Sequence, residues 1–361
     1  MLYRKYRPQI FGDVVSQEHV VRTLKGALSS GRLSHAYLFS GPRGTGKTTL
    51  ARIFAKALNC QHRRKDGEPD NTCENCLAIN EGRSLDLIEI DGASNGRIDE
   101  IRNLKDSAVV AAPGGGYKVF IIDEVHMVTK EAFNALLKIL EEPPAHVMFV
   151  LATTDPQKIP PTVLSRVQRF DFKKLTSQEI VEKLKTIAKA EKINVDDEVI
   201  ASIASSSEGA LRDAEVSLSK VMSSFDTSEK ITFDKATLVL GLIPEHFHPD
   251  FLSYLMNNER VLALGLIQRL YESGHNLEHF TKNFMEYLRK VLIKKVNPAA
   301  LASMGEEPVG DGATRLAQLA QQLDSQQLIR MMTVFTNARN EMKISPIPQL
   351  PLELAVMELI P

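Results

Sequence analysis

The segment Gly41-Pro42-Arg43-Gly44-Thr45-Gly46-Lys47-Thr48, hereafter the phosphate loop, limits the possible folds of this chain more than any other part. It matches the pattern G-x-x-x-x-G-K-[ST] at every fixed position. The apolar run Ala36–Phe39 before it predicts a buried strand, and apolar residues at helical spacing over 50–58 predict a helix after it. Strand, glycine loop and helix in this order predict a phosphate site in an α/β sheet.

Glycines in such a loop allow backbone N–H groups to face an anion, and the helix N-terminus adds partial positive charge. We expect Lys47 to reach the β- and γ-phosphates, Thr48 to hold Mg²⁺, and Thr49 to complete the phosphate contacts. The alternative is an ordinary glycine turn between strand and helix, with an incidental lysine.

The bulk properties of the sequence narrow the class of protein. A chain of 361 residues with 43% hydrophobic and 25% charged residues predicts two or three globular domains. No apolar run reaches the roughly 18 residues that span a bilayer, and the basic N-terminus lacks the apolar segment of a secretory signal. Three cysteines do not make a disulfide framework, so we expect a cytoplasmic protein without membrane contact.

A net charge of −1 argues against a surface coated with basic residues for binding nucleic acid. Any DNA contact would use a local patch, or several copies that share the task. One candidate is the turn before the helix predicted from about Ile98, where Arg97 and Arg102 would grip DNA phosphates. A solvated helix start explains the same residues equally well.

Two carboxylates follow the apolar run 119–122, which predicts a strand buried on both faces. Open α/β sheets bind ligands at the carboxyl ends of their strands. Asp123 there suits a Mg²⁺ contact, and Glu124 suits a base that polarises water for attack on the γ-phosphate. The next predicted strand, 147–152, delivers Thr154 to the same edge, where its hydroxyl would sense the γ-phosphate. The alternatives are an acidic turn and a strand-end cap.

The N-terminal segment contains Tyr6-Arg7-Pro8 and precedes the phosphate loop. Such a segment often packs over the base of a nucleotide, so Arg7 and Pro8 are candidate nucleotide contacts. An arm that only closes the core is an equally good explanation.

A polar insertion, residues 60–76, follows the predicted loop helix and carries all three cysteines, Cys60, Cys73 and Cys76. Tetrahedral zinc needs four ligands, and the fourth would be Asp70 or His62. The alternative is a loop with free thiols whose former metal site has decayed.

Strands cease to alternate with helices at about Leu175. The sequence predicts an α/β core over 1–174, a small helical domain over 175–241, and a second helical region over 242–361 that suits packing or assembly.

The order of these motifs resembles an AAA+ ATPase, and more narrowly the gamma/tau clamp-loader subunits of bacterial DNA polymerase III. The resemblance covers essentially the whole chain and is densest up to residue 215. Besides the cysteine insertion, its most specific segments are Tyr6-Arg7-Pro8, His35-Ala36-Tyr37-Leu38-Phe39, Asp123-Glu124-Val125-His126-Met127, Leu140-Glu141-Glu142-Pro143-Pro144, Leu151-Ala152-Thr153-Thr154-Asp155-Pro156-Gln157-Lys158 and Glu208-Gly209-Ala210-Leu211-Arg212-Asp213.

The resemblance implies roles that spacing does not reveal. It makes Arg166 an arginine finger for the ATP site of a neighbouring subunit, and Arg212 a phosphate contact from a helical lid in its own subunit. The alternative for each is a surface ion pair. It makes residues 242–361 a collar that holds a ring together, and residues 94–102 a region that tracks DNA.

The function implied by the resemblance is ATP hydrolysis that opens a sliding clamp and loads it on primed DNA, within a DNA-directed DNA polymerase holoenzyme. The implied cofactors are ATP, Mg²⁺ and Zn²⁺. The implied partners are the clamp, other clamp-loader subunits and further copies of the chain.

Two positions depart from the family pattern. Val167 stands where the family has cysteine after the arginine, and Asp70 stands where the zinc module has its fourth cysteine. The alternatives are another AAA+ DNA-remodelling ATPase, such as a branch-migration helicase, and a scaffold that binds ATP without turnover.

Overall fold

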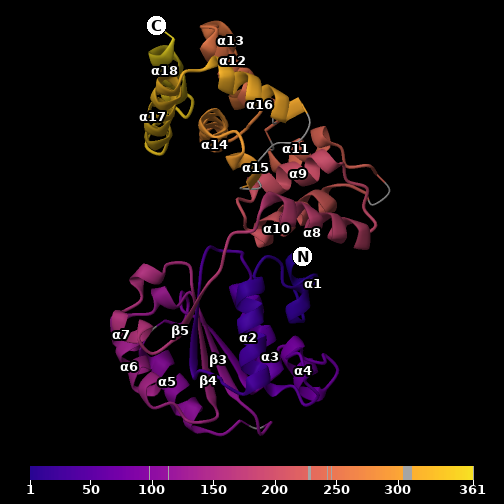
Figure 1. The fold of residues 1–361 in the computed structure, drawn as a ribbon, viewed down its shortest axis with the longest axis vertical. Coiled ribbons are helices and arrows are strands. Elements are labelled where there is room, and N and C mark those ends of the chain that lie inside the picture. The colour runs from indigo at the N-terminus through magenta and orange to yellow at the C-terminus, as the bar shows by residue number, and fades with distance from the viewer. Residues whose placement is uncertain are drawn as a thin grey trace. The chain divides into compact units, whose positions relative to one another are not determined.

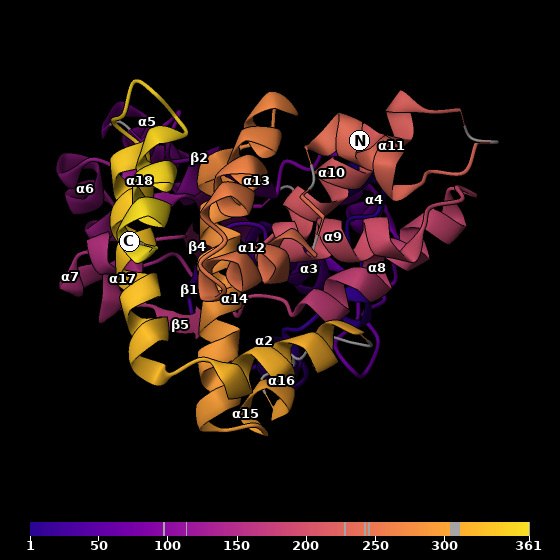
Figure 2. The ribbon, with the colours of Figure 1, turned by 90° about the horizontal axis from the view of Figure 1, so that it is seen from above.

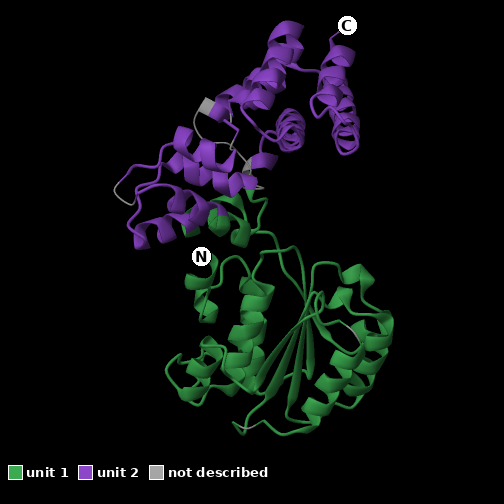
Figure 3. Ribbon diagram, turned by 180° about the vertical axis from the view of Figure 1, so that it is seen from behind, with its two compact units in different colours: residues 1–183, 207–216 green, residues 184–206, 217–361 purple. Residues whose placement is uncertain are grey.

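The computed structural model divides the chain into two compact units (Figure 3). One contains residues 1–183 and 207–216, and the other contains residues 184–206 and 217–361. The structure describes residues 1–96, 98–112, 114–226, 229–241, 243–244, 246–303 and 311–360. The predicted domain ranges 1–174, 175–241 and 242–361 stay a prediction.

The first unit is built on a five-stranded parallel sheet with strand order β2-β3-β4-β1-β5 (Figure 1). The strands are β1 (Ala36–Ser40), β2 (Leu87–Asp91), β3 (Lys118–Asp123), β4 (Val147–Thr153) and β5 (Gln168–Asp171). The strand register pairs Ser40 with Thr153 and Asp91 with Asp123. The carboxyl ends of the central strands therefore meet at one edge, as predicted for an α/β fold.

Helices cover both faces of this sheet, because successive side chains of a strand point to opposite faces. On β3, Val119 and Ile121 pack in one core with α2 (Glu18–Ser30) and α3 (Lys47–Asn59). Phe120 and Ile122 pack in the other core with α5 (Ile98–Val109) and α6 (Lys130–Glu141). Figure 1 shows these two helix layers on opposite sides of the strands. The predicted parallel sheet flanked by helices is confirmed.

Short helices complete the first unit. They are α1 (Leu2–Lys5), η1 (Phe11–Asp13), α4 (Glu74–Asn80), η2 (Val125–Met127), η3 (Pro156–Lys158) and α7 (Pro161–Leu164). Helix α4 was not predicted, because the polar insertion gives too short an apolar pattern to indicate a helix. Its buried residues are Cys76 and Ile79.

Helices with a shared apolar core form most of the second unit, and Figure 2 shows several of them from above. Phe251 lies at the centre of the core, with its ring 5.4 Å from that of Phe280, 4.9 Å from Phe284 and 5.9 Å from Phe335. The helices after the sheet are α8 (Ser177–Ala190), α9 (Asp197–Ser206), α10 (Leu211–Ser224), α11 (Phe233–Leu240), α12 (Phe247–Met256), α13 (Arg260–Glu272), α14 (Leu277–Val296), α15 (Ala300–Ser303), α16 (Asp311–Gln322), α17 (Ser325–Met342) and α18 (Leu350–Leu359). The helical character predicted for the region after Leu175 is confirmed.

Within the described residues, every helix is too short or too polar to span a membrane.

Candidate functional site

The phosphate loop joins β1 to α3, as the sequence predicts. All three of its glycines have backbone angles that L side chains rarely adopt, with φ of 149° at Gly41, 77° at Gly44 and 96° at Gly46. A Cβ at Gly41 would also lie 2.5 Å from the carbonyl oxygen of Phe172. The loop therefore needs glycine for its conformation at all three positions, and for close packing at Gly41.

Lys47 begins α3 and is only 6% exposed. Its Nζ donates hydrogen bonds to the carbonyl oxygens of Gly41 (2.7 Å) and Pro42 (2.8 Å). Burial lowers the pKa of Lys47, while the negative charges of Glu124 and Asp123 act in the opposite direction. The structure thus brings the predicted phosphate-binding lysine close to both predicted acidic residues.

Thr48 and Asp123 meet directly, since the Thr48 hydroxyl donates to Asp123 Oδ2 at 2.7 Å. The other carboxylate oxygen, Oδ1, accepts a hydrogen bond from the Glu124 amide at 3.0 Å. Mg²⁺ prefers a small number of hard oxygen ligands from the protein, alongside phosphate and water. An adjacent hydroxyl and carboxylate at the end of the phosphate loop fit that requirement.

Glu124 is held by residues at the end of the neighbouring strand. Its Oε2 accepts hydrogen bonds from the Thr154 hydroxyl at 3.0 Å and the Thr154 amide at 3.3 Å. The same oxygen lies 3.3 Å from Nδ1 of His126, and that nitrogen is also 3.0 Å from the Thr153 hydroxyl. His126 has no predicted role, and its position two residues after Glu124 is the sequence signal for it. The predicted catalytic pair, Glu124 and Thr154, is in direct contact.

Arg166 lies away from this group in the hydrogen-bond network. Its guanidinium pairs with Glu141 (2.8 Å between Nη2 and Oε1) and donates to the carbonyl of Thr162 at 2.7 Å. It lines an open surface hollow of about 730 Å³ together with Ser34 and His35. In the described part of the chain, none of its hydrogen-bond partners belongs to the phosphate loop.

Arg212 lies in the segment 207–216, which belongs to the same compact unit as the phosphate loop. Its guanidinium carbon is 4.8 Å from the ring centre of Tyr3 in α1. The preceding residues contact the loop, because a Cβ at Gly44 would lie 3.0 Å from Cβ of Ala210. Arg212 is therefore anchored close to the loop by its own helix and by the N-terminus.

Arg7 is half-buried in the N-terminal arm, residues 1–13. Burial lowers its pKa, and the positive charges of Arg52 and Arg212 add to this effect. Pro8, next in the chain, is also half-buried. The arm thus runs beside the residues that surround the phosphate loop.

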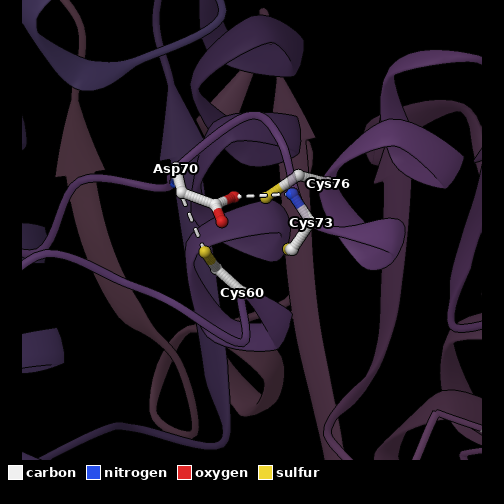
Figure 4. Close-up of side chains that lie close together, drawn as sticks. All are labelled: Cys60, Asp70, Cys73 and Cys76. Carbon is white, nitrogen blue, oxygen red and sulfur yellow. Dashed lines mark hydrogen bonds between the residues drawn. The ribbon is translucent and has the colours of Figure 1, made fainter.

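The three cysteines and Asp70 form a separate cluster in the insertion (Figure 4). Their ligand atoms all lie within 4.8 Å of one another, whereas the sulfur atoms of a tetrahedral zinc site are about 3.8 Å apart. His62 lies outside the cluster, with Nδ1 3.2 Å from Asp70 Oδ2. Asp70, rather than His62, therefore provides the fourth candidate ligand.

The charge state of the cluster favours Asp70 as its anion. Burial raises the pKa of the Cys76 thiol far above its ordinary range, and hydrogen bonding to Asp70 raises it further. Burial also opposes ionisation of Asp70, but hydrogen bonds from Cys76, Cys73 and Thr72 outweigh it and hold the pKa of Asp70 well below its usual value. Three sulfur donors and one ionised carboxylate are a donor set that zinc accepts.

Of the two predicted DNA contacts, Arg97 lies outside the described residues. Arg102 is exposed on α5 and pairs with Asp99 at 3.3 Å.

Comparison with known proteins gives matches in both halves of the chain. Residues 16–176 match the family model "DNA polymerase III, delta subunit", and residues 231–361 match "DNA polymerase III subunits gamma and tau domain III". The chain is 43% identical over 358 residues to DNA polymerase III subunit tau of Bacillus subtilis, covering 99% of this chain and 62% of that protein. It is 34% identical over 360 residues to DNA polymerase III subunit gamma of Buchnera aphidicola, covering 100% of this chain and 98% of that protein.

A solved structure of a RuvB mutant from Thermotoga maritima shares the fold, with a TM-score of 0.50 and 20% identity over 70% of this chain and 80% of that one. At this level of identity the likeness concerns the fold alone. The chain spans less than two thirds of the length of the Bacillus subtilis relative.

Proposed function

Because this chain belongs to the gamma/tau family of DNA polymerase III subunits, we propose that it is an ATP-hydrolysing motor subunit of a clamp loader. It would open a sliding clamp and load it on primed DNA, within the polymerase holoenzyme in the bacterial cytoplasm. One observation carries the proposal. The Thr48–Asp123 hydrogen bond joins the phosphate loop to the end of β3, and the Glu124–Thr154 hydrogen bond joins the end of β3 to the end of β4, at one sheet edge.

The phosphate loop supplies the binding half of the mechanism. Backbone N–H groups of residues 41–49 and the N-terminus of α3 would hold the phosphates of ATP. The Lys47 ammonium, now bonded to two loop carbonyls, would exchange these for β- and γ-phosphate oxygens. Thr48 and Asp123 would hold Mg²⁺, which neutralises charge on the phosphates when it is bound.

Glu124 supplies the hydrolytic half. Its carboxylate would orient a water in line with the γ-phosphate and draw a proton from it. In the structure, Oε2 of Glu124 is bonded to Thr154 instead. Hydrolysis would therefore require Thr154 to turn its hydroxyl to the γ-phosphate, which frees the carboxylate for water.

The two arginines would complete the site in different ways. Arg212, close to the loop of its own chain, would contact the nucleotide phosphates in cis. Arg166, in an open hollow, would enter the site of a neighbouring copy or of another clamp-loader subunit. Arg97 and Arg102 stay proposed contacts to the DNA backbone, as do Arg7 and Pro8 to the nucleotide.

We also propose that Cys60, Asp70, Cys73 and Cys76 bind one structural Zn²⁺. The compact set of three sulfurs and one carboxylate supports this. Elemental analysis of the purified chain tests it, with about one zinc per chain expected and a clean zero contradicting it.

The deciding experiment measures ATP turnover by this chain with its companion subunits, with and without the clamp and primed DNA. Strong stimulation by clamp and primed DNA together is expected. Stimulation by four-way junction DNA alone would favour the branch-migration alternative. ATP binding without turnover under every condition would favour a scaffold. The match of residues 231–361 to a gamma/tau family domain favours the clamp loader.

A further inference from the structure

One buried carboxylate of the cysteine insertion, residues 60–76, forms hydrogen bonds with the N-terminal arm. Glu68 is 5% exposed, although it belongs to a polar surface insertion. Its Oε2 accepts a hydrogen bond from the Phe11 amide at 2.8 Å, and its Oε1 accepts one from the Gly12 amide at 3.0 Å. Two consecutive backbone amides of the arm therefore donate hydrogen bonds to a residue more than fifty positions away in the sequence.

A salt bridge with Lys25 offsets the cost of burying the Glu68 carboxylate. Nζ of Lys25 on α2 lies 3.2 Å from Glu68 Oε1 and 3.0 Å from Asp66 Oδ2. A buried carboxylate is costly unless it is paired and hydrogen-bonded, and Glu68 has one cation and two amide donors. The Glu68 side chain is therefore held in one position, and it fixes the backbone of the arm at Phe11 and Gly12.

A second buried charged residue, Lys56, also forms a hydrogen bond with the arm. Lys56 on α3 is 2% exposed, and its Nζ donates to the side-chain oxygens of Gln9 (3.1 Å) and Asn80 (2.7 Å). Asn80 is the last residue of α4, which begins in the insertion. Burial lowers the pKa of Lys56 to about 8. The lysine thus joins the helix of the phosphate loop, the arm and the helix of the insertion.

These anchors lie next to the part of the arm that approaches the nucleotide site. Gln9 directly follows Arg7 and Pro8, and Arg7 feels the charges of Arg52 and Arg212. Nearer the N-terminus, the Tyr3 ring packs on the guanidinium of Arg212. The anchored residues 9–12 therefore set where the preceding residues of the arm lie beside the phosphate loop.

We propose that Glu68 and Lys56 are positioning residues that hold the N-terminal arm against the base of a bound nucleoside triphosphate. The inference rests on the proposed function, because it takes Arg7 and Pro8 as nucleotide contacts. It gives the insertion a part in nucleotide selection, besides any metal it binds. Positioning through the arm would affect recognition of the base and leave recognition of the phosphates largely unchanged.

The test compares dissociation constants of the full chain for ATP and for inorganic tripolyphosphate, which has no base. Glu68→Ala removes both carboxylate oxygens that accept hydrogen bonds from the Phe11 and Gly12 amides. Glu68→Gln keeps one oxygen acceptor but loses the ion pair with Lys25. We expect Glu68→Ala to weaken ATP binding by roughly tenfold, Glu68→Gln to weaken it less, and tripolyphosphate binding to change by less than about twofold.

Asp66→Asn is the matched control. It removes a carboxylate from the same insertion that pairs with the same lysine, but Asp66 is 58% exposed at its side chain. Its affinity for both ligands should equal that of the unmodified chain. Equal losses for ATP and tripolyphosphate in the Glu68 variants, or no loss for ATP, would overturn the proposal.

Lys56→Met keeps the test decisive if the Glu68 variants do not fold, since it removes the bond to Gln9 without removing a carboxylate. It should also weaken ATP binding selectively, and an unchanged ATP affinity in a folded protein would overturn the proposal. Arg7→Ala distinguishes a failure of this inference from a failure of the proposed ATPase function. If it leaves ATP affinity intact, the arm does not contact the nucleotide and the inference fails, while the proposed ATPase function stands on the Lys47 and Glu124 variants described below.

Discussion

Arg166 is ion-paired with Glu141 of its own chain, at 2.8 Å between Nη2 and Oε1. The side chains are 33% and 50% exposed, respectively. Exposed ion pairs of this kind contribute under about 1 kcal/mol to stability. The pair therefore orients the arginine at the edge of α6, and it would yield easily if Arg166 contacts a phosphate of another subunit, as proposed.

Arg166→Ala should leave ATP binding by the isolated chain intact and reduce ATP turnover in the assembled complex by roughly 10³–10⁵-fold. Glu141→Gln is the matched control, because it breaks the same ion pair but keeps the guanidinium. Its turnover in the complex should stay close to normal. If Arg166→Ala impairs the isolated chain as much as the complex, the arginine does not act in trans.

Lys47→Ala should abolish measurable nucleotide binding, because it removes the cation that neutralises the β- and γ-phosphates. Isothermal titration with ATP measures the binding, and a thermal melt shows whether the variant is folded. Retained affinity would contradict the assignment of the phosphate loop.

Glu124→Gln should keep ATP binding and slow turnover by roughly 10²–10⁴-fold, since the amide does not accept a proton from water. Thr154→Val should also retain binding, with a smaller loss of turnover, because it removes the hydroxyl that would turn from Glu124, now at 3.0 Å, to the γ-phosphate. Single-turnover measurements on the assembled complex separate chemistry from product release. Normal turnover by Glu124→Gln would exclude this residue as the base.

Asp70→Cys should bind zinc more tightly than the unmodified chain, because a thiolate is the softer ligand. Competition with a chromophoric chelator measures the difference, and Asp70→Ala should bind zinc more weakly than either. His62→Ala is a useful control, since His62 lies outside the ligand set. If its zinc affinity falls as far as that of Asp70→Ala, the histidine is itself a ligand.

Glu215 on α10 gives a prediction about pH. It is 6% exposed, and burial raises its pKa to about 7, despite the positive charges of Lys183 and Arg7. The folded state therefore binds a proton more tightly than the unfolded state does. The stability that protonated Glu215 contributes is complete below its ordinary pKa of 4.5 and is lost as pH rises through about 7.

Glu215→Gln should consequently raise the free energy of unfolding at pH 8 by roughly 2–4 kcal/mol, and change it little at pH 4.5. Urea unfolding of the full chain at the two pH values provides the measurement. An equal effect at both would mean that the substitution acts through packing and not through the proton.

Local patterns were sufficient to predict the elements that carry the chemistry. The glycine spacing of residues 41–48 requires a tight turn between strand and helix, and the apolar run before Asp123 requires a buried strand. These constraints act over a few consecutive residues, so they can be recognised in the sequence without knowledge of the tertiary contacts. The same locality explains why α4 was not predicted, since its seven residues are held by contacts outside the segment.

Local spacing along the chain was enough to predict a phosphate loop, a strand ending in two carboxylates, and helical regions after the sheet. Which of these residues meet depends on how the chain folds. The strand order puts β1 and β3 on either side of β4, so that Thr48 reaches Asp123 and Glu124 reaches Thr154. The tertiary fold also places Asp70, and not His62, within the cysteine cluster, and it buries Glu68 against the N-terminal arm. Strand pairing and the burial of a charge depend on partners far apart in the chain, and local spacing does not specify those partners.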